Sequence, residues 1–80
     1  MKCTQYFLSI RQRPDRSIIK EEWLLETIMD PLKTEVQTDK RIRKWGYVEE
    51  VGKYLRVILL DDDETVHNAF FDRNFKKEEL

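Results

Sequence analysis

The spacing of apolar residues in the first third of the chain predicts one strand followed by one helix. Thr4–Ile10 is rich in aromatic and β-branched residues, which favours a strand. Pro14 then interrupts it, because proline fixes φ and restricts the residue before it. In the residues that follow, apolar side chains recur at the spacing of one helix face. Ser17 fits an N-cap and Asp30-Pro31 fits a stop, so we expect a helix over about residues 17–30.

Beyond residue 31 the pattern changes from that of a helix to that of strands. Turn-forming residues separate four short runs rich in β-branched and aromatic residues, namely Thr34–Thr38, Arg41–Val48, Tyr54–Leu60 and Thr65–Phe71. Short connections favour antiparallel neighbours. The sequence therefore predicts an α+β fold, in which one helix in the N-terminal half packs on a meandering antiparallel sheet of four or five strands. No repeat or linker interrupts the pattern, so we expect residues 1–80 to form a single domain.

The register of the predicted strands decides which polar side chains share a face. With a two-residue turn at Asp62-Asp63, opposed residues share a face in the pairs Leu60–Thr65, Leu59–Val66, Ile58–His67, Val57–Asn68, Arg56–Ala69 and Leu55–Phe70. The face expected under the helix holds Leu55, Val57, Leu59, Val66, Asn68 and Phe70. The opposite face holds Tyr54, Arg56, Ile58, His67, Ala69, Phe71 and Arg73. A turn at Val51-Gly52 adds to that second face Tyr47 beside Arg56, Trp45 beside Ile58, then Arg43 and Arg41.

Composition narrows the class of protein. A chain of 80 residues has room for one core, and with 40% hydrophobic residues its 39% charged content fits a solvated surface rather than disorder. Cys3 is the only cysteine, which excludes an intrachain disulfide framework. No apolar run approaches the roughly 18 residues that span a bilayer, and the first residues lack the features of a signal peptide. We expect a cytoplasmic protein without a membrane segment.

The net charge of −1 hides an uneven distribution. Residues 1–20 carry five bases and one acid, whereas the other sixty residues carry ten bases and fifteen acids. A near-neutral total can therefore contain a basic patch. The run Asp61–Glu64 lacks the spaced ligands and the glycine of a calcium loop, so it predicts a solvated turn. We expect no metal site and no cofactor.

Three segments carry a resemblance to known proteins. RPDR (Arg13–Arg16), DKRIRKW (Asp39–Trp45) and YLRVILLDDDETVHNAFFDRNFK (Tyr54–Lys76) resemble a family of small cyanobacterial proteins to which no activity is assigned. This resemblance covers nearly the whole chain. The helix-then-meander order is similar, more distantly, to the RelE/ParE-like fold of bacterial toxin–antitoxin systems, whose ribonuclease members cut mRNA with scattered basic residues. That likeness implies an RNA-directed function by analogy of architecture, without a catalytic motif to match.

The candidate functional residues lie on or near the predicted second face. His67, the only histidine, suits proton transfer, and Arg56 suits stabilisation of a charged transition state, so both are candidate catalytic residues. Taken alone, a histidine such as His67 is more often an ordinary strand residue than a catalyst, and a charge-assisted hydrogen bond to Arg56 can equally be structural. Bases interleaved with an aromatic residue resemble a single-stranded nucleic-acid platform, or an outer strand made soluble by charge. These candidate nucleic-acid contacts are Arg41, Arg43, Trp45, Arg73, Arg13 and Arg16.

Two functions stay open from the sequence. The first is a nucleic-acid-interacting domain with RelE-like ribonuclease character, with RNA as its partner. The second is a non-enzymatic interaction module that binds a protein partner or a second copy of the chain. The near-neutral net charge favours the second, since dedicated nucleic-acid binders are usually basic. The sequence does not decide whether the protein is an enzyme.

Overall fold

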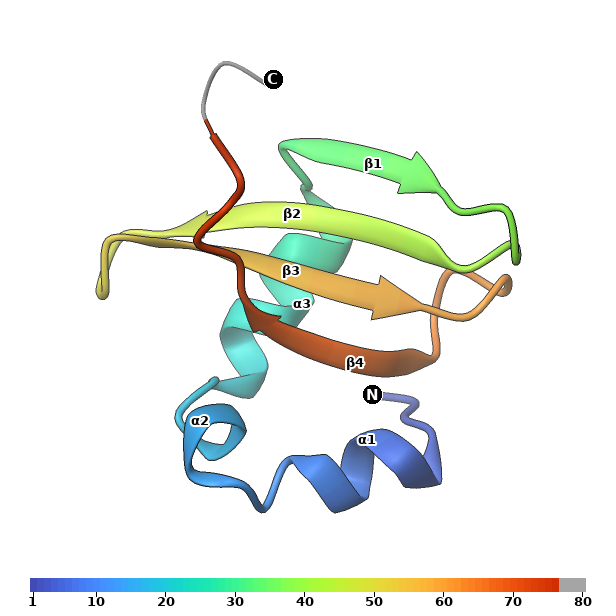
Figure 1. The fold of residues 1–80 in the computed structure, drawn as a ribbon, viewed down its shortest axis with the longest axis horizontal. Helices are drawn as coiled ribbons and strands as arrows, with labels where there is room; N and C mark the ends of the chain where they lie inside the picture. The colour runs from blue at the N-terminus through green and yellow to red at the C-terminus, as the bar shows by residue number, and fades with distance from the viewer. Residues whose placement is uncertain (77–80) are drawn as a thin grey trace.

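The computed structural model describes residues 1–76 as three short helices and a four-stranded antiparallel sheet (Figure 1). The elements are α1 (Gln5–Ile10), α2 (Pro14–Ser17), α3 (Glu21–Met29), β1 (Lys33–Val36), β2 (Ile42–Val48), β3 (Lys53–Leu59) and β4 (Val66–Phe71). Neighbouring strands in the sheet follow one another along the chain. The predicted α+β class and the four-stranded meander are confirmed. None of the helices in the described part of the chain is long and apolar enough to cross a membrane.

The two faces of the sheet are covered differently. α3 lies on one face, and the segment after β4 crosses the other (Figure 1). Leu55, Val57 and Leu59 of β3 are fully buried on the α3 side, where they form one core with Trp23 and Leu24. We call the side away from α3 the open face. Its strand residues include Arg43, Trp45, Tyr47, Tyr54, Arg56, Ile58 and Phe70.

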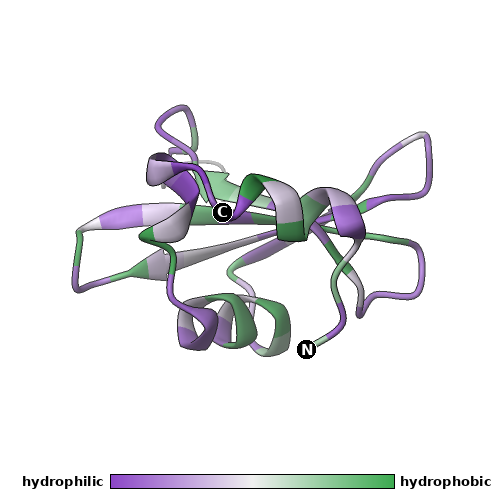
Figure 2. Ribbon diagram, turned by 90° about the horizontal axis from the view of Figure 1, so that it is seen from below, coloured by the Kyte–Doolittle hydropathy of each residue, from purple (hydrophilic) through white to green (hydrophobic). Residues whose placement is uncertain are grey.

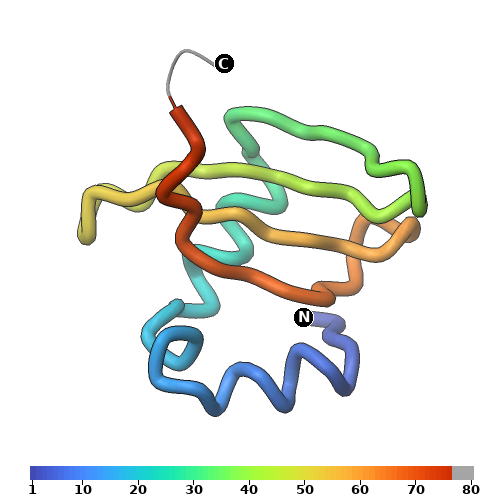
Figure 3. The backbone as a smooth tube through the Cα atoms, viewed as in Figure 1, coloured from blue at the N-terminus to red at the C-terminus, as the bar shows by residue number. Residues whose placement is uncertain are grey.

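The predicted strand over Thr4–Ile10 is wrong, because this segment forms α1. The hydroxyl of Thr4 caps the helix by accepting a hydrogen bond from the Phe7 N–H at 3.1 Å. Phe7 and Ile10, three residues apart, are buried in the core, which is the spacing of a helix face. Before α1, Cys3 forms a single parallel bridge to Val66 of β4. The tube in Figure 3 shows this N-terminal end beside β4.

The predicted helix over residues 17–30 is two helices with a break between them. Ser17 ends α2 instead of capping the longer helix, and its hydroxyl donates a hydrogen bond to the Pro14 carbonyl. The break turns Ile19 into the core, where its side chain is buried. α3 then begins after Lys20 and ends before Pro31, as the predicted stop requires.

The pairing of β2 with β3 is shifted by two residues from the predicted register. Trp45 lies opposite Arg56, and Tyr47 lies opposite Tyr54. A shift of two residues keeps every side chain on its face, so the prediction that Arg43, Trp45 and Tyr47 share a face with Arg56 is confirmed. The turn spans more than the predicted two residues, with Gly52 in the left-handed region at φ 63°.

A β-bulge at His67 moves the pairing of β3 with β4 by one residue. Leu59 pairs with Val66 as predicted, but the next residue, His67, has no partner on β3. The pairs predicted beyond this point are wrong, since the observed pairs are Ile58–Asn68, Val57–Ala69, Arg56–Phe70 and Leu55–Phe71. Phe70 and Asn68 therefore lie on the open face. Ala69 and Phe71 lie on the α3 side, where Ala69 is fully buried.

The connections at both ends of the sheet are largely hydrophilic, whereas the strands alternate between apolar and polar residues (Figure 2). This alternation leaves polar and charged side chains on the open face. The fold therefore places several of the candidate functional residues on one surface.

Candidate nucleic-acid interface

Cations and aromatic rings alternate in a row across the open face. The guanidinium carbon of Arg56 lies 5.2 Å from the ring centroids of both Trp45 and Phe70. From α2, Arg16 reaches the same Phe70 ring at 5.4 Å, and Lys33 of β1 lies 5.9 Å from the Trp45 ring. Cations at this distance are attracted by the ring faces. The structure thus brings together three of the predicted residues, Arg16, Trp45 and Arg56.

Asp72 fixes the centre of this row. Its Oδ2 accepts a hydrogen bond from the Trp45 indole N–H at 3.0 Å and lies 3.3 Å from Nε of Arg56. Phe75 stacks on Trp45, with ring centroids 5.2 Å apart, and leaves the indole 3% exposed. Trp45 is therefore covered rather than presented for base stacking, and Arg56 is neutralised by a carboxylate. Through these contacts with Asp72 and Phe75, Trp45 and Arg56 hold residues 72–76 on the sheet.

A hollow of about 520 Å³ lies beside the row, between α2 and the ends of β3 and β4. The rings of Phe70 and Phe71 and three cations, Arg16, Lys53 and Arg73, line it. Arg16 pairs with Asp15, but Lys53 and Arg73 form no ion pair with any residue in the described part. Predicted residues Arg16 and Arg73 thus meet here. Lys53 was not predicted, although its place at the start of a strand beside Gly52 suggested exposure.

Three predicted arginines share an unusual feature of their side chains. The Nε atoms of Arg16, Arg43 and Arg56 are buried and, within residues 1–76, have no hydrogen-bond partner. Arg43 reaches only Glu35, at 3.9 Å, and the contact of Arg56 with Asp72 lacks the geometry of a hydrogen bond. A buried N–H without an acceptor costs free energy. Because these Nε atoms are buried, any contact with an anionic ligand is left to the terminal nitrogens of the guanidinium groups.

The remaining predicted cations lie apart from the row. Arg41 precedes β2 and pairs with Asp39 at 3.8 Å. Arg13 is exposed at the N-cap of α2 and forms no ion pair in the described part of the chain. No hydrogen bond or ion pair among residues 1–76 ties either of them to Arg56.

The bulge turns His67 towards α1. Its ring stacks on Tyr6, with centroids 5.0 Å apart, and Nδ1 lies 3.2 Å from the Thr4 hydroxyl. That hydroxyl also accepts from the Phe7 N–H and has one lone pair left, so whether it donates to Nδ1 or accepts from it is set by the tautomer of the imidazole. Burial lowers the pKa of His67 below its ordinary 6.5, and the charge of Arg41 lowers it further. The two predicted catalytic residues, His67 and Arg56, thus have separate sets of contacts.

Removing the Tyr6 ring is expected to raise the pKa of His67 towards 6.5. Tyr6→Ala uncovers the imidazole, and its burial is the largest cause of the lowered pKa. An NMR pH titration of the only histidine measures this directly. Tyr47→Ala, which removes another exposed tyrosine, leaves the pKa unchanged. A pKa in Tyr6→Ala at or below that of the native protein would contradict the assignment.

The same shift makes the stability of the fold depend on pH. Because the folded state binds the His67 proton less readily than the unfolded state, the free energy of unfolding falls as the pH drops from about 7 through the folded pKa. Above about 6.5 the histidine is neutral in both states, so this contribution to pH dependence disappears there.

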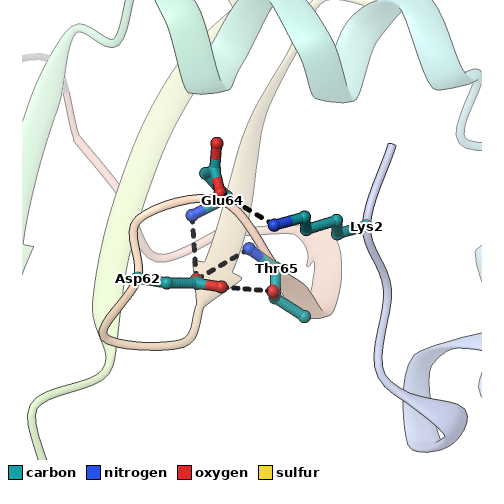
Figure 4. Close-up of polar contacts among 4 residues, drawn as sticks. All are labelled: Lys2, Asp62, Glu64 and Thr65. Atoms are coloured by element: carbon teal, nitrogen blue, oxygen red, sulfur yellow. Dashed lines mark hydrogen bonds and ion pairs between the residues drawn. The ribbon is translucent and has the colours of Figure 1, made fainter.

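The acidic turn before β4 is held by its own hydrogen bonds (Figure 4). The carboxylate of Asp62 accepts from the backbone N–H groups of Glu64 and Thr65 and from the Thr65 hydroxyl. These bonds, the one from the hydroxyl first, lower the pKa of Asp62 to about 2. The turn also forms ion pairs between Lys2 and Glu64 and between Lys44 and Asp63. Within residues 1–76 no group of three or more acids, histidines or cysteines is arranged to hold a metal ion.

Comparisons of the chain with known protein families, with curated proteins and with solved structures find no match. What this protein binds is therefore inferred from its own side chains.

Proposed function

We propose that the open face and the hollow beside α2 bind single-stranded nucleic acid, with RNA as the ligand. The observation that carries this proposal is that two cations without an ion pair in residues 1–76, Lys53 and Arg73, line one hollow with the rings of Phe70 and Phe71. Proteins that bind single strands combine backbone phosphate contacts with aromatic side chains that stack bases. The hollow offers both within the reach of one nucleotide.

The distribution of charge supports this choice of face. Two acids, Asp15 and Asp72, line the hollow, and they pair with Arg16 and Arg56 respectively, which leaves Lys53 and Arg73 in excess. The acids of α3 and of the two turns at Glu49-Glu50 and Asp61–Glu64 lie outside the row and the hollow. The charge of −1 for the whole chain therefore does not describe the open face, where strand-borne cations gather. A local basic surface is sufficient to attract phosphate at moderate salt.

The proposed ligand runs from the hollow along the open face. Lys53 and Arg73 contact the first phosphates, and the guanidinium of Arg43, whose side chain is 33% exposed, supports a further one across β2. At the same end of the sheet, Tyr47 is exposed and packs against Tyr54, so a base can stack on its free face. Trp45 contributes as support for Arg56 and not as a stacking surface.

A more specific function, cleavage of the bound RNA, would depend on His67. With its pKa lowered from 6.5, His67 is a neutral imidazole at pH 7, which suits the base that removes a 2′-hydroxyl proton, but the ring contacts Thr4 and Tyr6 and shares no contact with Arg56. Arg56, the second predicted catalytic residue, is neutralised by Asp72. Binding without cleavage is therefore the function that we propose first. The analogy with RelE/ParE-like ribonucleases adds no residue to it.

Titration of a fluorescent single-stranded RNA at several salt concentrations tests the proposal. Binding followed by anisotropy is expected to weaken steeply with salt. Lys53→Gln with Arg73→Gln reduces the slope of log K against log salt by about 0.7 for each lost contact. Lys2→Gln with Lys40→Gln removes the same charge from positions outside the hollow and leaves the slope unchanged.

Absence of binding at low salt, or equal effects of the two double variants, would exclude this surface as the interface. The same samples are assayed for RNA cleavage. Any cleavage that survives in His67→Ala would show that His67 is not catalytic.

A further inference from the structure

A second concave surface lies at the opposite edge of the sheet from the hollow. It is a groove of about 660 Å³ between α3, the link to β1 and the outer end of β2. Four of the ten exposed large apolar side chains in the described part of the chain line it, namely Leu25, Met29, Leu32 and Tyr47. Met29 alone is 83% exposed. Clustering of this kind is typical of a surface that binds another molecule.

Four carboxylates border this groove, and one of them has a compensating cation in the described part of the chain. Glu26, Asp30 and Glu49 line it and form no ion pair within residues 1–76. A fourth, Glu50, is already occupied by hydrogen bonds from Trp23 and Lys20, which lower its pKa. Among the residues that the structure describes, no lysine, arginine or histidine lines the groove. A ligand that complements the groove therefore has apolar side chains with positively charged side chains next to them.

The backbone of β2 adds a third feature at the same place. β1 pairs with β2 only as far as Trp45, whose carbonyl accepts from the Leu32 N–H at 2.7 Å. Backbone groups in an antiparallel strand alternate in direction, so those of Tyr47, two residues further on, point to the same side. Within residues 1–76 no strand lies there, because the chain turns away into α3. The groove therefore contains a short strand edge at Tyr47 whose backbone N–H and C=O face no partner strand in this part of the chain.

We infer that this groove binds a short extended segment of a partner protein in which apolar and basic residues alternate. The backbone of the segment pairs with Tyr47 in the manner of an added strand. Its apolar side chains pack on Leu25, Met29 and Leu32, and its lysines or arginines face the free carboxylates. The groove shares no lining residue with the hollow, and it meets the proposed path of the nucleic acid only at Tyr47, whose backbone faces the groove while its ring is offered to a base.

The test uses a capped synthetic peptide of alternating lysine and leucine, with a glutamate–leucine peptide of the same length as a negative probe. Binding is followed by amide chemical shifts of the full chain. The Lys-Leu peptide is expected to shift Gly46–Val48 and the α3 residues. Glu26→Gln with Glu49→Gln is expected to weaken it about fivefold, and Met29→Ser is expected to weaken it by a similar factor.

Matched variants separate this site from general attraction of a basic peptide. Glu21→Gln removes an exposed acid from the same helix outside the groove, and Leu8→Ser removes an exposed apolar residue of α1. Neither is expected to change the affinity. All these positions are exposed, so the variants keep the fold, and circular dichroism verifies this. Equal weakening by the matched variants, shifts centred on Asp61–Glu64, or no binding would overturn the inference.

Discussion

Replacing Gly46 with alanine is expected to lower the free energy of unfolding by about 2 kcal/mol, in the range for overpacked cores. Gly46 lies on β2 where α3 crosses the sheet, and a Cβ atom there would lie 2.6 Å from Oγ1 and 3.2 Å from Cβ of Thr27. Thr27 cannot easily move, because it is buried and its hydroxyl donates to the Trp23 carbonyl at 2.9 Å. Urea denaturation measures the loss.

A double-mutant cycle identifies the cause. Thr27→Ala removes Oγ1 and Cγ2, the nearest and third-nearest atoms to the new methyl group, so Gly46→Ala costs less in that background. Gly52→Ala is the matched glycine control. Its cost comes from φ 63° and not from crowding, so it is unaffected by Thr27→Ala. Strict additivity of Gly46→Ala and Thr27→Ala would show that contact between α3 and β2 is not the source.

The four strands were predictable because each is a short run of β-branched and aromatic residues between turn residues. α1 was missed because the same composition over six or seven residues fits a buried helix as well as a strand. The signal was present in the capping position of Thr4 and the three-residue spacing of Phe7 and Ile10. Only packing against Val66 and its neighbours decides between the two.

The candidate site was predictable in part, since its strand residues follow from alternation. Arg43, Trp45 and Arg56 share a face in any register that differs by an even number of residues. Phe70 was placed on the wrong face because one unpaired residue, His67, reverses everything after it. That bulge depends on contacts with Thr4 and Tyr6, which are distant in sequence. Local patterns carry no information about such contacts.

The hollow itself could not be predicted from the sequence. Arg16 comes from α2, Lys53 from the start of β3, and Arg73 from the segment beyond β4. These positions are brought together by the chain path and not by any spacing along it. The covering of Trp45 by Phe75 was equally hidden, because residues 72–76 have no regular secondary structure.

Replacing Asp72 with alanine is expected to cost about 2 to 3 kcal/mol of stability, which is the largest loss that we expect from a single charged residue here. Breaking a fully buried ion pair costs roughly 3–5 kcal/mol, but the side chain of Arg56 is 24% exposed while that of Asp72 is 9% exposed, so the cost is smaller. The change leaves the Trp45 indole N–H without its acceptor and the guanidinium of Arg56 without its counter-charge. Thermal and urea unfolding measure the loss.

Two further variants distinguish the lost charge from the lost hydrogen bonds. Asp72→Asn keeps an acceptor for Trp45 and removes only the charge, so it is expected to cost less than Asp72→Ala. Arg56→Met in the Asp72→Ala background removes the stranded cation, and the double variant is then more stable than the sum of the single changes predicts. If Arg56→Met gave no such recovery, Asp72 would stabilise the fold through Trp45 and the Asn74 backbone alone. The contact between Asp72 and Arg56 would then contribute no stability, and Arg56 would be a third cation, with Lys53 and Arg73, available to the proposed RNA ligand.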